Sequence, residues 1–271
     1  MKHISRIYLC LIFGILYIPI ITLIFFSFNS ANSTAVFQGF SLRWYKELFN
    51  SPETFTALRN TLILAVSAAT LSTVIGTAAA KGIYKMRSKL LKSAITTVTN
   101  VPMMNPDIVT AMSMMLFFVA VAGVLGISYD NMGFAAMLIA HTTFCLPYVI
   151  LSVLPRINEL GDSLSEAAMD LGCTPMQSFL KVELPNIMPG VLSGFVMAFT
   201  LSLDDFVISY FVGSSTFQTL PLLIYSMTKK KVTPDMYALS TIIIVVIFAL
   251  LIFTNLRSSK EEQRKKRRAS K

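Results

Sequence analysis

A chain of 271 residues with 54% hydrophobic residues and a mean hydropathy of +0.66 is too apolar to be a soluble domain of this length. Its net charge of +9 does not indicate nucleic-acid binding, because much of the excess lies at 81–92 and 257–271, beside apolar runs, where basic residues orient a membrane protein. Several runs reach the roughly 20 residues that a helix needs to cross a bilayer. Because lipid offers the backbone no hydrogen bonds, the sequence predicts an all-α, polytopic membrane protein in a single domain, 1–271.

Six transmembrane helices are expected, at about 7–28, 61–80, 94–123, 132–154, 187–212 and 236–256. The first follows Lys2 and Arg6 and is longer than the apolar core of a secretory signal, so we interpret it as an uncleaved helix with a cytoplasmic N-terminus. In the polar outer segment 29–57, Trp44 and Tyr45 are typical of an amphipathic helix at the membrane interface. An ordinary surface turn is the alternative there.

The second and third helices are separated by the segment 81–92, which holds five basic residues and no acid and therefore predicts the cytoplasmic side. Pro102 and Pro106 predict a break or kink near the start of the third helix. A short outer turn at 127–131 leads to the fourth helix, in which Pro147 predicts another kink.

An outer loop, 213–235, separates the fifth and sixth helices, and the basic tail is expected to be disordered in the cytoplasm, so that both termini lie inside. Three consecutive lysines at 229–231 oppose this topology, but the longer basic segment 81–92 outweighs them. The three cysteines, Cys10, Cys145 and Cys173, show no disulfide or metal-binding spacing and are expected to be small buried residues.

A polar island, the 163–185 segment, lies between the fourth and fifth helices. Ser163 and Glu166 have the spacing of a capping box at a helix start, and Gly172 can adopt the left-handed conformation that closes such a helix. Thr174 and Pro175 predict the start of a second short helix, which Pro185 would end. The result would be a compact knob, read either as an amphipathic hairpin at the membrane interface or as a docking element.

The residues of this segment favour docking. Glu166, Ala167 and Ala168, then Gly172, then Leu184 and Pro185, resemble the EAA loop of the membrane subunits of bacterial ATP-binding-cassette (ABC) importers, with Val182 where that family has isoleucine. The resemblance implies a type I (MetI-like) permease fold and a cytoplasmic coupling loop at 156–186, which sits in a cleft of an ATPase subunit. The implied coupling residues are Glu166, Ala167, Ala168, Asp170, Gly172, Leu184 and Pro185.

Three carboxylates lie in or beside apolar runs: Asp107, Asp204 and Asp205. A carboxylate near the bilayer centre costs about 2.5–3.5 kcal/mol, so each should face protein or water, and no lysine or arginine lies at a comparable depth to pair with it. Structural alternatives remain open: Asp107 as a helix cap, Asp204 as a packing acceptor and Asp205 as an interface residue. His141 is expected to be a hydrogen-bonding core residue.

Unpaired acids favour a cationic cargo, and the aromatic rings of Phe117 and Tyr210 would attract ammonium groups. The stretches MNPDIV, HTTFCLPYVI, TLSLDDFVISYFV and LPLLIYSM resemble the membrane subunits of bacterial spermidine/putrescine importers. That resemblance implies a second homologous permease subunit, a dimer of ATPase subunits, an extracytoplasmic polyamine-binding protein and a location in the bacterial inner membrane. The substrate-pathway hypothesis therefore comprises Asp107, Asp204, Asp205, Phe117 and Tyr210.

The expected mechanism is alternating access driven by ATP. The sequence has no GxxxxGK[ST] phosphate loop, so we expect no enzyme activity and no cofactor in this chain, with ATP and Mg²⁺ bound by the partner ATPases. The alternatives are the same architecture with another solute, such as ferric ion or an organic anion, a proton-coupled secondary carrier, and a passive assembly protein. No internal repeat supports the secondary carrier.

Overall fold

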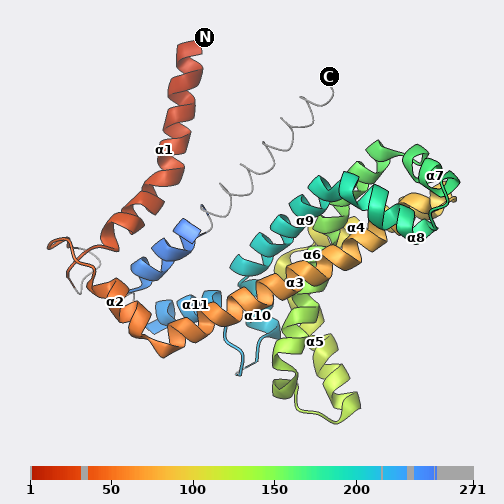
Figure 1. Cartoon of the computed structure of the whole chain (residues 1–271). Helices are drawn as coiled ribbons and strands as arrows, with labels where there is room; N and C mark the ends of the chain where they lie inside the picture. The colour runs from red at the N-terminus through yellow and green to blue at the C-terminus, as the bar shows by residue number, and fades with distance from the viewer. Residues whose placement is uncertain (1, 32–35, 215, 231–234, 247, 249–271) are drawn as a thin grey trace. The chain divides into compact units, whose positions relative to one another are not determined.

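The computed structural model describes residues 2–31, 36–214, 216–230, 235–246 and 248. Over these residues the regular secondary structure is helical, apart from one isolated bridge between Asn29 and Phe40. It divides into two compact units, unit 1 (1–56 and 223–271) and unit 2 (57–222). The elements in chain order (Figure 1) are α1 Lys2–Phe26, α2 Arg43–Asn50, α3 Pro52–Lys85, α4 Lys89–Met104, α5 Asp107–Leu125, α6 Tyr129–Leu160, α7 Ser163–Asp170, α8 Pro175–Ser178, the π-helix η1 Phe179–Glu183, α9 Leu184–Asp204, α10 Val207–Val212 and α11 Leu220–Lys230.

Within the described ranges, four helical stretches are long and apolar enough to cross a membrane: Pro52–Lys85, Asp107–Leu125, Met132–Leu160 and Pro175–Asp204. Two shorter apolar helices, Leu11–Ser27 and Asp235–Val246, coincide with parts of the expected first and sixth spans. The end of the sixth span and the basic tail lie outside the described residues. The count of six spans therefore stays a prediction.

The break expected near the start of the third span is confirmed, because the structure has two separate helices there, α4 and α5. Asn105 ends α4 in an extended conformation (φ −75°, ψ 142°), and Pro106 precedes α5. Proline disfavours the helical conformation in the residue before it and has no N–H to donate, so the chain breaks at this point.

The fifth span is also divided, contrary to the expected continuous helix at 187–212. Helix α9 ends at Asp204, Asp205 is extended (φ −63°, ψ 121°), and α10 begins at Val207. The expected loops contain helices too: α11 lies within 213–235, and α6 already begins at Tyr129, with a kink at Gly133 (φ 17°, ψ −101°).

Unit 1 confirms a helix around Trp44 in place of a surface turn. The indole Nε1–H of Trp44 donates to the carbonyl of Asn29 at 2.7 Å, and the hydroxyls of Tyr45 and Ser27 are 2.7 Å apart. Trp44 and Leu48 are buried side chains of α2. The location of this helix at a membrane interface stays a prediction.

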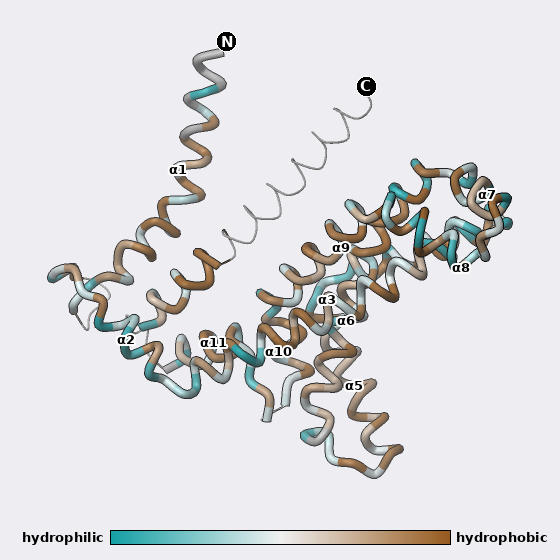
Figure 2. Tube along the Cα trace, viewed as in Figure 1, coloured by the Kyte–Doolittle hydropathy of each residue, from teal (hydrophilic) through white to brown (hydrophobic). Residues whose placement is uncertain are grey.

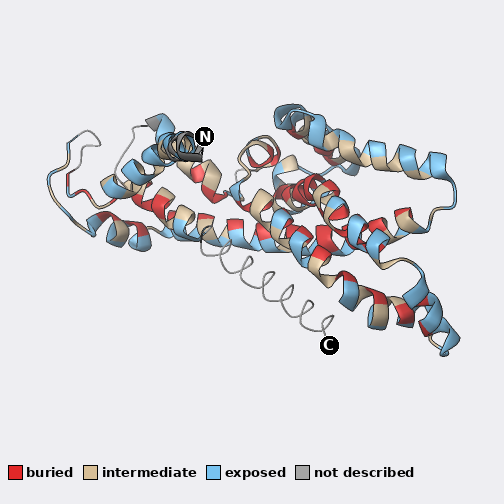
Figure 3. Cartoon of the chain, turned by 90° about the horizontal axis from the view of Figure 1, so that it is seen from above, coloured by how far each residue is buried: buried red, intermediate tan, exposed pale blue. Residues whose placement is uncertain are grey.

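Unit 2 is organised around α6, which packs against α9, α5, α10 and α4. Its side chains Met137, Val149 and Val153 are fully buried, while many residues on the outer helix faces are exposed (Figure 3). Large apolar side chains such as Leu116 and Val124 are among the exposed ones, as expected for contact with lipid. Cys145 is buried as expected, Cys173 is half-buried, and the side chain of Cys10 lies outside the described part.

The crossing of α6 and α9 is unusually close. A Cβ added at Gly190 would lie 2.9 Å from the carbonyl oxygen of Ser152, and one at Gly194 would lie 3.3 Å from Cα of Val149. Small residues four apart let membrane helices approach at the backbone, so this pair sets the distance between the two helices.

Candidate functional site

The 163–185 segment lies at one end of unit 2 and contains the predicted first short helix, α7, followed after a turn by a second helix that opens with α8 (Figure 1). The capping box at Ser163 is wrong. Asp162 is the N-cap of α7, without a side-chain capping hydrogen bond, and Ser163 is already the first helical residue. A hydroxyl inside the helix cannot reach the free N–H groups ahead of it, which an N-cap residue satisfies.

The turn between the two helices confirms two predictions. Gly172 has φ +90°, a conformation that other residues rarely adopt, and the next N–H, that of Cys173, donates back to the carbonyl of Ala168 at 3.1 Å. Thr174 caps α8 in a reciprocal box: its hydroxyl accepts from the N–H of Gln177 at 3.3 Å, and the Gln177 side chain accepts from the N–H of Thr174 at 3.1 Å.

Pro185 does not end the second helix, contrary to expectation. The chain stays helical from Pro175 to Asp204, through the π-helix Phe179–Glu183, in which the N–H of Leu184 donates to the carbonyl of Phe179 five residues earlier. Pro185 lies in the first turn of α9, where its missing N–H is tolerated. The wide turn lets the chain accommodate the proline without breaking.

The two short helices are joined by buried hydroxyls. The side-chain oxygens of Ser165 and Ser178 are 3.1 Å apart, and Ser178 also reaches the carbonyl of Ser165 at 3.2 Å. On the other face, Leu171 is 88% exposed and Met176 66% exposed. Hydrophilic residues are frequent around α7 and α8 in Figure 2, so two exposed apolar side chains here form a small surface suited to contact with another protein.

The implied coupling residues are distributed over this knob. Glu166, Ala167, Asp170, Gly172 and Pro185 are exposed, Leu184 is half-buried and Ala168 is buried. Glu166 forms no ion pair within the part of the chain that the structure describes.

A buried ion pair fastens this segment to α3. The ammonium of Lys81 contacts Oε2 of Glu183, the last residue of η1, and only 4% of the Glu183 side chain is exposed. Sequence reasoning treated Lys81 only as an orientation signal and missed the pairing, since 102 residues separate the partners. Nothing in the sequence around Glu183 indicates that its partner is Lys81.

Of the three acids predicted for the substrate pathway, Asp107 and Asp204 are exposed and Asp205 is largely buried. Asp204 is exposed at the end of α9 and makes no hydrogen bond to another described helix, which does not fit a packing role. The Asp205 carboxylate is largely buried and accepts from the N–H groups of Ile208 at 3.3 Å and Ser209 at 2.8 Å, so it caps α10. Asp107 is the exposed first residue of α5.

His141 confirms the expected core role. Its Nδ1 lies 2.8 Å from the hydroxyl of Ser202, and its Nε2 lies 3.2 Å from the hydroxyl of Ser209 and 3.5 Å from Asp205. This network connects α6 to both sides of the break between α9 and α10. Among the described residues no lysine or arginine pairs with Asp107, Asp204 or Asp205.

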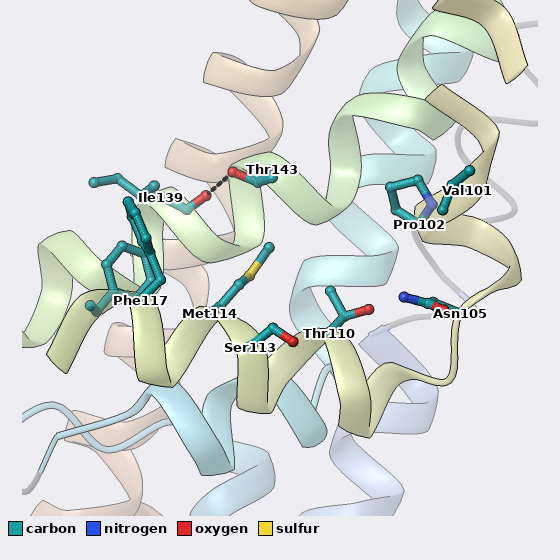
Figure 4. Close-up of a pocket in the computed structure, with 10 residues that line it drawn as sticks. Val101, Pro102, Asn105, Thr110, Ser113, Met114, Phe117, Ile139 and Thr143 are labelled. Carbon is teal, nitrogen blue, oxygen red and sulfur yellow. Dashed lines mark hydrogen bonds between the residues drawn. The ribbon is translucent and has the colours of Figure 1, made fainter. Parts of the chain in front are cut away.

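A cavity of about 360 Å³ lies between α4, α5 and α6 (Figure 4). Phe117, predicted as a pathway residue, lines it, whereas Tyr210 stands on α10, 45% exposed and in contact with the ring of Phe206. The cavity walls also carry polar side chains that sequence reasoning did not identify: Asn105, Thr110, Ser113 and Thr143. Asn105 and Thr110 lie close to Asp107 in the sequence, and this proximity to a predicted pathway residue could have identified them as cavity-lining residues.

Comparison with known proteins shows which family has this architecture. Residues 72–258 match the family described as binding-protein-dependent transport system inner membrane component. The putrescine transport system permease protein PotI of Escherichia coli K12 is 39% identical over 231 residues, 85% of this chain and 82% of that protein. The spermidine/putrescine transport system permease protein PotC of Haemophilus influenzae is 40% identical over 236 residues, 87% of this chain and 89% of that protein.

Among solved structures, a chain of a bacterial ABC transporter involved in the import of the acidic polysaccharide alginate has the same fold, with a TM-score of 0.75, 19% identity, and 96% of this chain and 98% of that chain covered. The family match and both permease relatives extend over most of the present chain. This chain therefore belongs to the binding-protein-dependent transport system inner membrane component family and has the fold of an ABC importer permease.

Proposed function

We propose that this chain is a permease subunit of an ATP-driven importer that moves polyamines, spermidine or putrescine, across the inner membrane by alternating access. The complex would contain a second homologous permease, two ATPase subunits and an extracytoplasmic polyamine-binding protein. The names of the relatives at 39–40% identity support the cargo class. Both termini and the 163–185 segment would face the cytoplasm, on the same side as the basic segment 81–92.

The observation that carries the cargo class is the uncompensated charge at the break between α9 and α10. Asp205 uses its carboxylate to cap α10, but Asp204 beside it is exposed and has no basic partner in the described ranges. A carboxylate at membrane depth needs a counter-charge, which a protonated amine of the cargo would supply. The ring of Phe117, which lines the cavity between α4, α5 and α6, would attract an ammonium group of such a cargo.

The knob supplies the surface on which the ATPase would act. Glu166 offers an exposed charge, and Leu171 and Met176 offer exposed apolar contacts around it. ATP and Mg²⁺ would bind on the ATPase subunits, since this sequence has no phosphate loop. Closure of the ATPase dimer would then move the 163–185 segment, and α9, which continues from it as one helix, would move with it.

The test is uptake of radiolabelled putrescine and spermidine by cells that lack this chain, with and without its reintroduction. We expect reintroduction to restore uptake, and Asp204→Asn to lower it at least tenfold while the assembled complex remains at wild-type amount. Asp205→Asn should lower both uptake and the amount of complex, because it weakens the cap of α10. Glu53→Gln, which changes an exposed acid in the first turn of α3, is the matched control and should leave uptake unchanged.

Three results would contradict the proposal. Unchanged uptake in Asp204→Asn would remove the cargo role of that residue. Uptake into vesicles that contain this chain without any ATPase would favour a proton-coupled carrier. Restored uptake of a different solute, with polyamine uptake unaffected, would keep the architecture and replace the cargo.

A further inference from the structure

The ion pair between Lys81 and Glu183 lies at the junction between the 163–185 segment and the core of unit 2. We propose that it is the positioning element that keeps this segment in register with α3, so that a displacement of the knob reaches the transmembrane helices instead of being lost in local bending. This inference rests on the proposed coupling of the knob to an ATPase.

Glu183 differs from the other acids of the segment. Glu166 and Asp170 are exposed and available to a partner protein, whereas 3% of Glu183 is exposed. A carboxylate is almost never buried to this extent without a charged partner, because the protein must replace the water it loses. Lys81, with 16% of its side chain exposed, is that partner.

The position of Lys81 is held from a second direction. Its ammonium lies 5.5 Å from the centroid of the Tyr84 ring, and the ammonium of Lys92, from α4, lies 5.4 Å from the same ring. The cluster of Lys81, Tyr84, Lys92 and Glu183 therefore connects the ends of α3 and α4 with η1. Lys85, Arg87 and Lys89 of the same basic stretch are exposed and take no part in it.

The π-helix accounts for the place of Glu183 in this cluster. A residue of an α-helix advances by about 100° around the axis, and a π-turn adds one residue to a turn, which changes the direction of the side chains after it. The wide turn at Phe179–Glu183 thus sets the phase between α8 and α9, and its last residue meets α3. Such bulges inside α-helices are frequent at functional sites.

An ion pair suits a positioning role better than an apolar contact would. Apolar side chains can slide and repack, whereas a buried charge has a favourable energy only opposite its partner and so specifies one register. The hydroxyls of Ser165 and Ser178 join α7 to α8, and the continuous helix joins α8 to α9. With the ion pair in place, the whole knob is fastened to α3 as well as to α9.

The experiment uses the complete transporter, with both permeases, the ATPases and the polyamine-loaded binding protein, in proteoliposomes. Polyamine uptake and ATP hydrolysis are measured together, and the readout is their ratio. A substitution that only destabilises the complex lowers both in proportion and leaves the ratio unchanged. We expect Lys81→Met and Glu183→Gln each to lower the ratio at least fivefold, and the charge-exchanged double variant Lys81→Glu, Glu183→Lys to recover it to within twofold of wild type.

Two further variants keep the test decisive if the single changes prevent assembly. Lys81→Arg keeps the charge and should keep the ratio, and Glu183→Asp keeps the charge on a shorter side chain and should lower the ratio about twofold or more. The matched control is Glu47→Gln in α2, outside the coupling loop, which removes the exposed ion pair with Arg43 (side chains 48% and 55% exposed) and should leave the ratio unchanged.

The outcomes separate the inference from the function on which it rests. If the wild-type complex hydrolyses ATP without moving polyamine, the proposed function fails. If the wild type transports, and Glu183→Asp or the assembled single variants keep its ratio, only the role of the ion pair is overturned. Failure of the double variant to recover a ratio lost in the single variants would also overturn it.

Discussion

Gly190→Ala tests the close crossing of α6 and α9 most directly. The new methyl group would lie 2.6 Å from Cγ of Arg156 and 2.9 Å from the carbonyl oxygen of Ser152. The arginine side chain can move aside, but the carbonyl belongs to α6 itself, so the two helices must separate. Forcing an extra methyl group into a packed interface costs about 1–3 kcal/mol.

The control for this substitution is Gly123→Ala in α5, where a new Cβ would meet no atom within 4 Å. Both substitutions gain up to about 1 kcal/mol of helix propensity, so the difference between them isolates the packing term. At about 2–4 °C for each kcal/mol, we expect Gly190→Ala to unfold roughly 2–12 °C below Gly123→Ala.

The assay is thermal unfolding of the purified protein in detergent, followed by far-ultraviolet circular dichroism, with the unfolding midpoint as the measured quantity. Wild type, Gly190→Ala and Gly123→Ala are compared in the same detergent, because lipid-like molecules contribute to the midpoint. Equal midpoints for the two variants would show that α6 and α9 are not in backbone contact at Gly190, and the reasoning about this crossing would be refuted.

Three further predictions concern local contacts. His141→Leu removes the imidazole partner of the buried hydroxyls of Ser202 and Ser209, so the free energy of unfolding should fall by about 1–3 kcal/mol for each hydroxyl left unpaired, and an unchanged chemical-denaturation midpoint would contradict this. Thr174→Ala removes the acceptor of the Gln177 N–H, at a cost of about 1 kcal/mol, and should speed amide hydrogen exchange in α8 but not in α5. Trp44 is the single tryptophan of the chain and is 7% exposed, so the emission of the purified chain should be blue-shifted and resist quenching by iodide; emission typical of exposed indole would refute its burial.

The local backbone conformation could be predicted from the sequence where neighbouring residues determine it. Gly172 adopts the left-handed conformation that its position after a short helix predicts, and Thr174 caps the helix that Pro175 opens. The break at Pro106 follows from the missing N–H of proline and the restriction on the residue before it. The same reasoning failed at Ser163 and Pro185, because the helices there begin one residue earlier and continue further than the local signals indicate.

The division of the fifth span shows why hydropathy alone was insufficient. Residues 187–212 are apolar enough to read as one helix, but Asp205 turns its carboxylate onto the N–H groups of α10, and His141 on α6 contacts the hydroxyls of Ser202 and Ser209 on the two sides of the break. The hydrogen bonds of Asp205 are local and join residues three and four positions apart, but those of His141 join residues 61 and 68 positions apart. A window of neighbouring residues contains the first contribution to the break and not the second.

The order of apolar runs and basic segments in the sequence was enough to predict an all-helical membrane protein. The residues of the 163–185 segment were enough to indicate the family of the chain, because both predictions depend on short-range patterns. The pairing of Lys81 with Glu183, the approach of α6 to α9 at Gly190 and the different surroundings of Asp204 and Asp205 became visible only in the folded chain. Each depends on burial, and burial depends on which distant segments come together: a charged side chain is buried in an ion pair or left exposed according to the partner that folding places opposite it.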